Sequence, residues 1–180
     1  MMNLQFSTLF QNLQNDVSMA MKAPGSLHPL VVHFPIALLF VFPLFLVMGF
    51  IFYKSSRAFH LSGLILLALG TLSIFSAIKT GEMASEPLAL APAAVATLEA
   101  HDNWAGQSRF IFCCLFLTFS TYFFLSNAGI FKSREKIHLA FLVLFLCFYS
   151  YGLLILWNTA HQGGKLVHDH GVKSNFYGSK

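Results

Sequence analysis

The chain has 180 residues, of which 56% are hydrophobic and only 10% are charged, and its formal net charge is +4. Soluble domains carry about 25% charged residues, so this composition indicates a membrane protein, and the dispersed positive charge gives no sign of a nucleic-acid partner. The three cysteines lie inside apolar runs without a CxxC or CxxCH motif, which leaves a disulfide framework, a zinc knuckle and covalent c-type haem without support.

Residues 1–26 are expected to form a segment that lies on the membrane surface, with a weakly ordered tail as the alternative. Phe6, Phe10, Leu13 and Val17 follow one another at spacings of four, three and four, which places them on one face of a helix. A short amphipathic helix of this kind rests in the membrane interface with its apolar face toward the lipid. No basic start and no apolar core precede the first lysine, so the pattern of a cleaved signal peptide is missing.

One transmembrane domain over residues 27–162 contains four apolar segments, at about 29–53, 61–80, 106–130 and 137–160. Each segment is close to the roughly 20 residues that cross about 30 Å of hydrocarbon. Because backbone groups in lipid must find partners within their own segment, all four segments are helices. We therefore predict an all-α fold, an integral membrane four-helix bundle with up-down-up-down order.

The connections between the spans predict the orientation. The two short connections, 54–60 and 132–136, are basic, whereas the longer one also holds acidic residues. By the positive-inside rule the short connections are cytoplasmic. In a bacterial inner membrane both termini and the long connection would then be periplasmic, on what we call the outer face.

The long connection, residues 82–105, is expected to combine a loop with an outer-face helix. Gly81 is a signal for the end of the second span, and Pro87 and Pro92 interrupt the chain after it. Good helix formers follow Pro92 without a further proline. A helix that begins with Pro92 in its first turn and continues into the third span is therefore expected.

The last 18 residues, 163–180, are expected to form an outer-face tail. Gly163 and Gly164 come directly after the fourth span and indicate a helix C-terminus. The apolar Leu166 and Val167 suit a short segment packed over the mouth of the bundle. A hydrophilic tail without structure is the alternative.

Eight histidines are present, and six of them fall at the outer face under this topology. His60 and His138 lie at the other face beside the basic connections, where headgroup contact or helix capping explains them. His28 and His33 are five residues apart, which is not a same-face spacing. We expect His28 to lie at the interface, before the helix, and His33 to point into the bundle. Pro35 removes a backbone hydrogen bond and could re-aim His33, although prolines are common in membrane helices.

His33, His101 and His161 come from three elements whose outer ends meet in an antiparallel bundle. Two facing imidazoles suit the axial positions of b-type haem iron. Arg109 and Lys79 are the candidates for contact with the propionates.

A metal ion is the alternative ligand of the same cluster. Copper, zinc or iron could bind His33, His101, His161 and His170, with a carboxylate such as that of Glu82 or Glu99. The spacing of these residues does not choose between haem and a metal ion.

The chain resembles a family of small bacterial four-helix membrane proteins catalogued as domain of unknown function 2231. The resemblance rests on four stretches: "LHPLVVHFPIALL" (27–39), "TGEMA" (80–84), "LEAHDNW" (98–104) and "AHQGGKLVHDHGV" (160–172). It implies a four-helix integral membrane domain, and the association of relatives with c-type cytochrome domains implies a redox role. The positions that match are His33, His101, His161, His170, Gly163 and Gly164. His168 replaces a frequent tyrosine, and the second glycine expected after "HG" is missing.

The leading hypothesis is a membrane electron-transfer protein that binds b-type haem. It would be a carrier rather than a stand-alone enzyme, since no nucleophile–base pair, phosphate loop or paired carboxylate lies within a span. Its expected partners are the lipid bilayer and other membrane or periplasmic redox subunits, and a homo-oligomer is left open. A metal-binding protein and a non-catalytic assembly subunit, whose histidines only tie helix ends together, are the alternatives.

Overall fold

The computed structural model describes residues 2–85, 90–130 and 135–172. Within these ranges the chain is helical and contains no strand, which confirms the all-α prediction. The elements follow in the order α1 (Met2–Lys22), η1 (Pro24–Leu27), α2 (His28–Val31), α3 (His33–Ile51), η2 (Tyr53–Ser55), α4 (Ser56–Ser85), α5 (Pro92–Asn127) and α6 (Glu135–His168).

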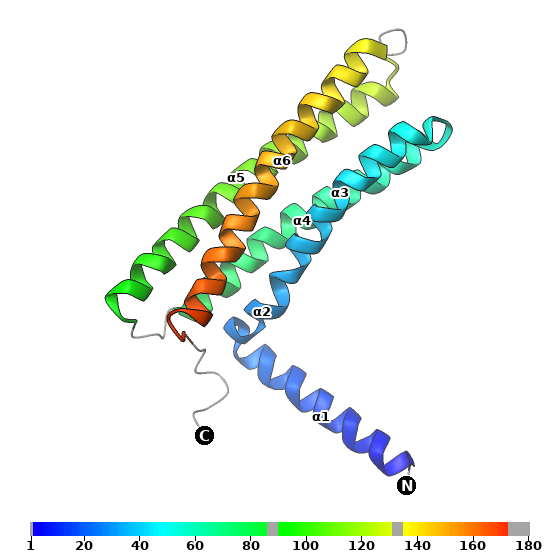
Figure 1. Ribbon diagram of the computed structural model, residues 1–180. Coiled ribbons are helices and arrows are strands. Elements are labelled where there is room, and N and C mark those ends of the chain that lie inside the picture. Colours follow the sequence, from blue (N-terminus) through cyan, green and yellow to red (C-terminus); the bar gives the residue numbers. More distant parts are fainter. Residues whose placement is uncertain (1, 86–89, 131–134, 173–180) are drawn as a thin grey trace.

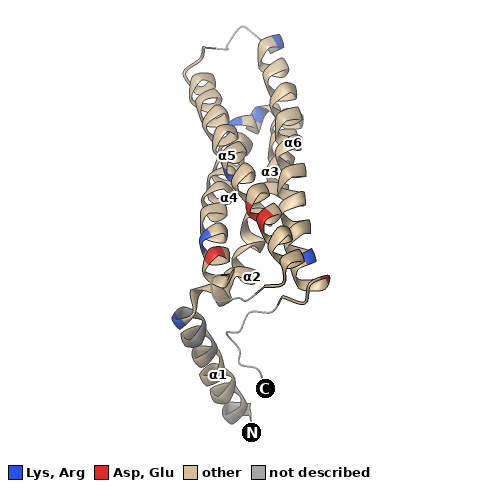
Figure 2. Cartoon of the chain, turned by 90° about the vertical axis from the view of Figure 1, so that its left-hand side faces the viewer, with Lys and Arg blue, Asp and Glu red and all other residues tan. Residues whose placement is uncertain are grey.

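The bundle consists of two helical hairpins, α3 with α4 and α5 with α6 (Figure 1). The hairpins meet mainly along α4 and α5, whereas α3 and α6 touch much less. Four helical segments are long and apolar enough to cross a membrane: Pro24–Ile51, Tyr53–Ser85, Pro92–Asn127 and Lys136–His168. Long uncharged stretches run along all of them (Figure 2). The predicted membrane four-helix bundle is confirmed.

Aromatic side chains fill the centre of the bundle. Phe42, Phe112, Phe119 and Tyr149 are fully buried there, and the Phe42 and Phe119 rings meet edge to face with centroids 5.3 Å apart. Large apolar side chains also cover the outside of the helices, such as Phe110 and Leu154. Such a surface suits contact with lipid hydrocarbon rather than water.

The α3–α4 hairpin is tightly packed because α4 presents glycine to α3. A Cβ at Gly70 would lie 2.7 Å from Cδ2 of Leu39, closer than side-chain atoms approach. Glycine therefore lets the two helices come together at this level, as small residues do in membrane helix pairs.

Helix α1 forms as the periodicity predicts, and it projects away from the bundle (Figure 1). Phe6, Phe10, Leu13 and Val17 are all more than half exposed, so the apolar face of α1 has no partner in the described part of the chain. The helix is shown, whereas its place at a membrane surface stays a prediction.

The ends of three helices show whether the glycine and proline residues predicted the helix boundaries correctly. Helix α5 begins at Pro92 and runs without interruption into the third span, as predicted. The two glycine signals were wrong, because α4 continues through Gly81 to Ser85 and α6 continues through Gly163 and Gly164 to His168. Residues 163–168 thus belong to the last helix and not to a tail. The His28 ring packs against Gly81, and the His101 ring packs against Gly163. A side chain at either position would crowd the ring, which explains why glycine occurs inside these helices.

Candidate functional site

The end of the bundle formed by α2, the last turns of α4, the first turns of α5 and the last turns of α6 is called the motif end here. It is the lower end of the bundle in Figure 1, where α1 is attached. His28 and His101 are its two most firmly held imidazoles, one in each hairpin.

His28 is the first residue of α2, and its half-buried ring faces α4. Its Nδ1 lies 3.0 Å from the main-chain carbonyl oxygen of Ala77 and 3.2 Å from Oγ1 of Thr80. A Cβ at Gly81 would lie 3.0 Å from Cε1 of the ring. Because a carbonyl oxygen only accepts, Nδ1 carries the proton and Nε2 of the neutral ring keeps a free lone pair.

His101 is held in the same manner within the second hairpin. Its Nδ1 donates to the main-chain carbonyl of Thr159 at 2.9 Å, and a Cβ at Gly163 would lie 3.2 Å from its Cε1. The neutral ring therefore also keeps Nε2 as the free acceptor. The Thr159 hydroxyl donates to the Ile155 carbonyl at 3.0 Å and lies 3.0 Å from the buried hydroxyl of Ser108, so the residue that anchors His101 is itself fixed.

His170 also contacts the start of α5. Its Nε2 and the hydroxyl of Thr97 are hydrogen-bonded at 2.8 Å, just beyond the end of α6. This contact brings the residues that follow α6 back onto α5.

The two anchored histidines lie at the same end of the bundle, one held by α4 and the other by α6. Asp102 follows His101 on α5, and Glu82 follows Gly81 on α4, so two carboxylates also belong to this end of the bundle. The motif end therefore holds two carboxylates and two imidazoles whose Nε2 atoms have no hydrogen-bond partner among the described residues.

The expected directions of His28 and His33 are reversed in the structure. Helix α2 ends at Val31 and α3 begins at His33, and Val32 between them keeps right-handed helical backbone angles and donates its N–H to the His28 carbonyl. Pro35 falls in the first turn of α3, directly after this interruption. His33 is exposed, and its Nδ1 donates to the carbonyl of Pro29, whereas His28 faces the bundle.

The other predicted haem contacts have no hydrogen bond to His101 among the described residues. His161 is exposed on α6, and Arg109 is exposed on α5 with its guanidinium 5.9 Å from the centre of the Phe75 ring. Lys79 pairs with Glu82 at 3.1 Å. Among the described residues no hydrogen bond or ion pair joins His161, Arg109 or Lys79 to His101, so their roles as cofactor contacts stay predictions.

The described residues contain no group of three or more His, Cys, Asp or Glu side chains that could hold a metal ion. The predicted metal set, His33, His101, His161 and His170, is therefore not assembled in this structure. Two of its members point to different partners, since His33 bonds Pro29 and His170 bonds Thr97.

A second polar cluster lies at the opposite end of the bundle. His60 is only 6% exposed, which contradicts its interpretation as a headgroup contact, and its ring centre lies 6.4 Å from that of His138. The Tyr122 hydroxyl lies 2.8 Å from Nε2 of His138. A signal for the burial of His60 was present, because His60, Gly63 and Leu67 follow a helical spacing and all three are buried.

The sequence model of a family described as "Predicted membrane protein (DUF2231)" matches residues 24–175. The chain belongs to this family. No curated protein and no solved structure matches it.

In this DUF2231 chain the four stretches that carry the resemblance meet in pairs at the motif end. The stretch 27–39 contacts the stretch 80–84 through His28 with Thr80 and Gly81. The stretch 98–104 contacts the stretch 160–172 through His101 with Gly163. His28 is the site residue that the sequence analysis missed, and the "TG" at 80–81 was its signal.

Proposed function

We propose that the protein is a membrane electron-transfer protein that binds b-type haem at the motif end, with His28 and His101 as the axial ligands. One observation carries the proposal: both imidazoles have Nδ1 bonded to a main-chain carbonyl of a neighbouring helix, and neither Nε2 atom has a hydrogen-bond partner among the described residues. Metal-ligating histidines are held in this way, because the second-shell bond fixes the tautomer and orients the ring.

The number of anchored imidazoles favours haem over a bare metal ion. A porphyrin supplies four of the iron ligands, so the protein needs to supply only two. A closed metal site needs more protein ligands, and the described residues offer no group of three. When bound, the haem would supply one-electron redox chemistry.

The protein's own residues would set the surroundings of the group. Thr159 and Ala77 hold the two rings, and the glycines at 81 and 163 let each ring lie against a helix backbone. Arg109 is the remaining candidate for a propionate, since Lys79 already pairs with Glu82. Apolar helix surfaces complete the environment that a porphyrin requires.

A metal ion is the second candidate, and one observation favours it. Asp102 directly follows His101 on α5 at the motif end, and imidazoles with a carboxylate are ligands for zinc, copper and iron. In this case the side chains of His28, His101 and Asp102 would have to move slightly to bring their ligand atoms around one metal ion.

The test is a reduced-minus-oxidised spectrum of the detergent-purified protein, expressed with haem precursor, together with elemental analysis. Wild type should show a Soret and an α-band. His28→Ala and His101→Ala should each lose them, while His168→Ala, which changes an exposed histidine at the end of α6, should keep them. Metal without porphyrin, lost in the same two variants, supports the second candidate. If the wild-type protein contains neither haem nor metal, both candidates are rejected, and a non-catalytic assembly subunit is the remaining hypothesis.

A further inference from the structure

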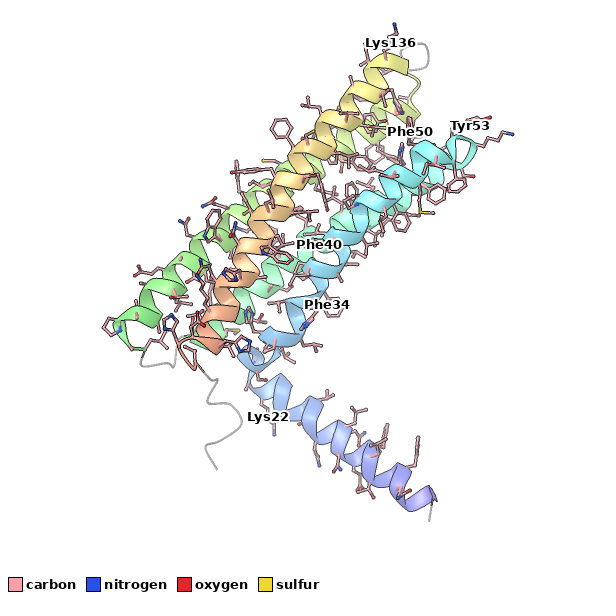
Figure 3. The ribbon with its side chains drawn as sticks, in the orientation of Figure 1. Lys22, Phe34, Phe40, Phe50, Tyr53 and Lys136 are labelled. Carbon is pink, nitrogen blue, oxygen red and sulfur yellow. The ribbon has the colours of Figure 1, made fainter. Side chains whose placement is uncertain are left out.

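An apolar groove lies between α3 and α6, the two helices that pack least closely in the bundle. Its lining is wholly apolar, its volume is about 320 Å³, and it consists of Ile36 and Phe40 on α3 and Leu156, Trp157 and Ala160 on α6. Trp157 is 65% exposed and Phe40 is 41% exposed, so the groove opens toward the surrounding bilayer. Figure 3 labels Phe40 on the part of α3 that runs beside α6.

Two exposed histidines of the motif stretches, His33 and His161, lie on the same helix faces as this groove, on its motif-end side. His33 precedes Ile36 by three residues in α3, and His161 follows Trp157 by four in α6, which are the spacings of side chains on one helix face. Because α3 leads away from the motif end and α6 leads toward it, both histidines lie at the same mouth. Nδ1 of His33 donates to the Pro29 carbonyl, and its Nε2 has no hydrogen-bond partner among the described residues.

We propose that this groove binds an isoprenoid quinone or quinol, with the hydrocarbon tail in the groove and the ring oxygens at His33 and His161. Nε2 of His33 can accept from a quinol hydroxyl, because its Nδ1 already donates to the Pro29 carbonyl. A neutral His161 ring offers one donor and one acceptor, so it can donate to a quinone carbonyl or accept from a quinol hydroxyl. An apolar cleft with a few polar groups at one end is the usual form of a small-molecule site. Neither His28 nor His101 lines the groove, so binding there does not require haem.

A phospholipid is the competing occupant of such a groove. Its phosphate would seek a cation, and Lys165 lies one helical turn beyond His161. Quinone binding depends on the two histidines and not on Lys165. The two occupants therefore predict opposite effects of substitutions at these positions.

The protein contains a suitable probe, because Trp157 lines the groove and Trp104 on α5 is the only other tryptophan. In a Trp104→Phe background, placed in nanodiscs of phosphatidylcholine, decylubiquinone should quench Trp157 fluorescence saturably. The double variant His33→Leu/His161→Leu should weaken the apparent affinity by about tenfold or more. Lys165→Gln should leave it unchanged, and Ala160→Phe, which fills the groove, should abolish saturation.

Quenching that rises linearly with quinone, or that is the same with and without the two histidines, would overturn the proposal. A phospholipid held by Lys165 would compete with the quinone, so tighter quinone binding in Lys165→Gln without any effect of the two histidines would indicate a phospholipid and reject the proposal. His33, Ala160 and His161 are exposed or line the surface, so these variants should fold, and gel filtration checks this. The fluorescence readout is separate from the haem spectrum, so either proposal can fail alone.

Discussion

The hydroxyl of Tyr149 on α6 donates a 2.8 Å hydrogen bond to the main-chain carbonyl of Leu39 on α3, between residues that are both fully buried. Leu39 lies four residues before Pro43, and a proline has no N–H to bond the carbonyl four residues earlier. The tyrosine therefore replaces the helical bond that the proline removes, and it does so from the other hairpin.

Tyr149→Phe should destabilise the bundle by about 1–3 kcal/mol, because the Leu39 carbonyl would be left without a partner in an apolar core. The free energy of unfolding in mixed detergent micelles measures this. The control is the same substitution in a Pro43→Ala background, where the alanine can supply the missing N–H. There the loss should be clearly smaller; an equal loss in both backgrounds would show that Pro43 is not the reason for the bond.

Gly163→Ala should be less stable than Gly164→Ala, although the two glycines are neighbours in α6. A Cβ at Gly163 would lie 3.2 Å from Cε1 of His101, whose Nδ1 is tied to Thr159, so overpacking costs about 1–3 kcal/mol. Nothing lies within 4 Å of a Cβ at Gly164, so there the better helix propensity of alanine should add about 0.5–1 kcal/mol. Thermal unfolding in detergent distinguishes the pair, and equal stability of the two variants would contradict the ring contact.

His60→Leu should change the free energy of unfolding by less than about 1 kcal/mol. Nε2 of His60 is buried without a hydrogen-bond partner in the described part of the chain. Leucine would remove this unsatisfied polar group, which offsets the loss of the packing contacts of the imidazole ring. His138→Leu is the comparison, and it should be more harmful because it breaks the contact with Tyr122. A larger loss at His60 would mean that its nitrogen binds a water molecule or an ion.

Helix α1 should lie on a bilayer with its apolar face in the lipid. Spin labels attached at Leu13→Cys and Asn15→Cys, in a variant without the three native cysteines, report the two faces of the helix. The label at position 13 should be accessible to oxygen dissolved in lipid, and the label at 15 to a water-soluble nickel complex. Equal access to nickel at both positions would place α1 in water.

Local sequence signals were sufficient to predict where the helices lie. They failed at positions where contact with a second helix determines the structure. The apolar runs and Pro92 define the spans and the start of α5 within the chain itself. Gly81 and Gly163 were taken as helix ends, because a glycine that ends a helix and a glycine that admits a ring from elsewhere look alike in sequence. The bond from Tyr149 to Leu39 joins residues 110 positions apart and depends on how the hairpins align.

The candidate site was predicted in part. His101 was singled out because its helix leads into the outer end of the bundle, and the structure gives it an anchored ring. His28 was missed because Pro29 suggested that the helix began after it, whereas a separate short helix turns this residue toward α4. Orientation in the membrane and the identity of any cofactor depend on charge bias and on ligand chemistry, and they stay predictions.

The anchors of His28 and His101 each lie within a single hairpin, so each half of the chain prepares one imidazole on its own. The two imidazoles come together only when the halves associate in the membrane. A ligand that binds both would therefore add its binding free energy to that association, since it binds the assembled state and not the separate halves. Cofactor loading and assembly of the bundle would be one coupled equilibrium, and loss of the cofactor would loosen the join between the halves before it unfolds either of them.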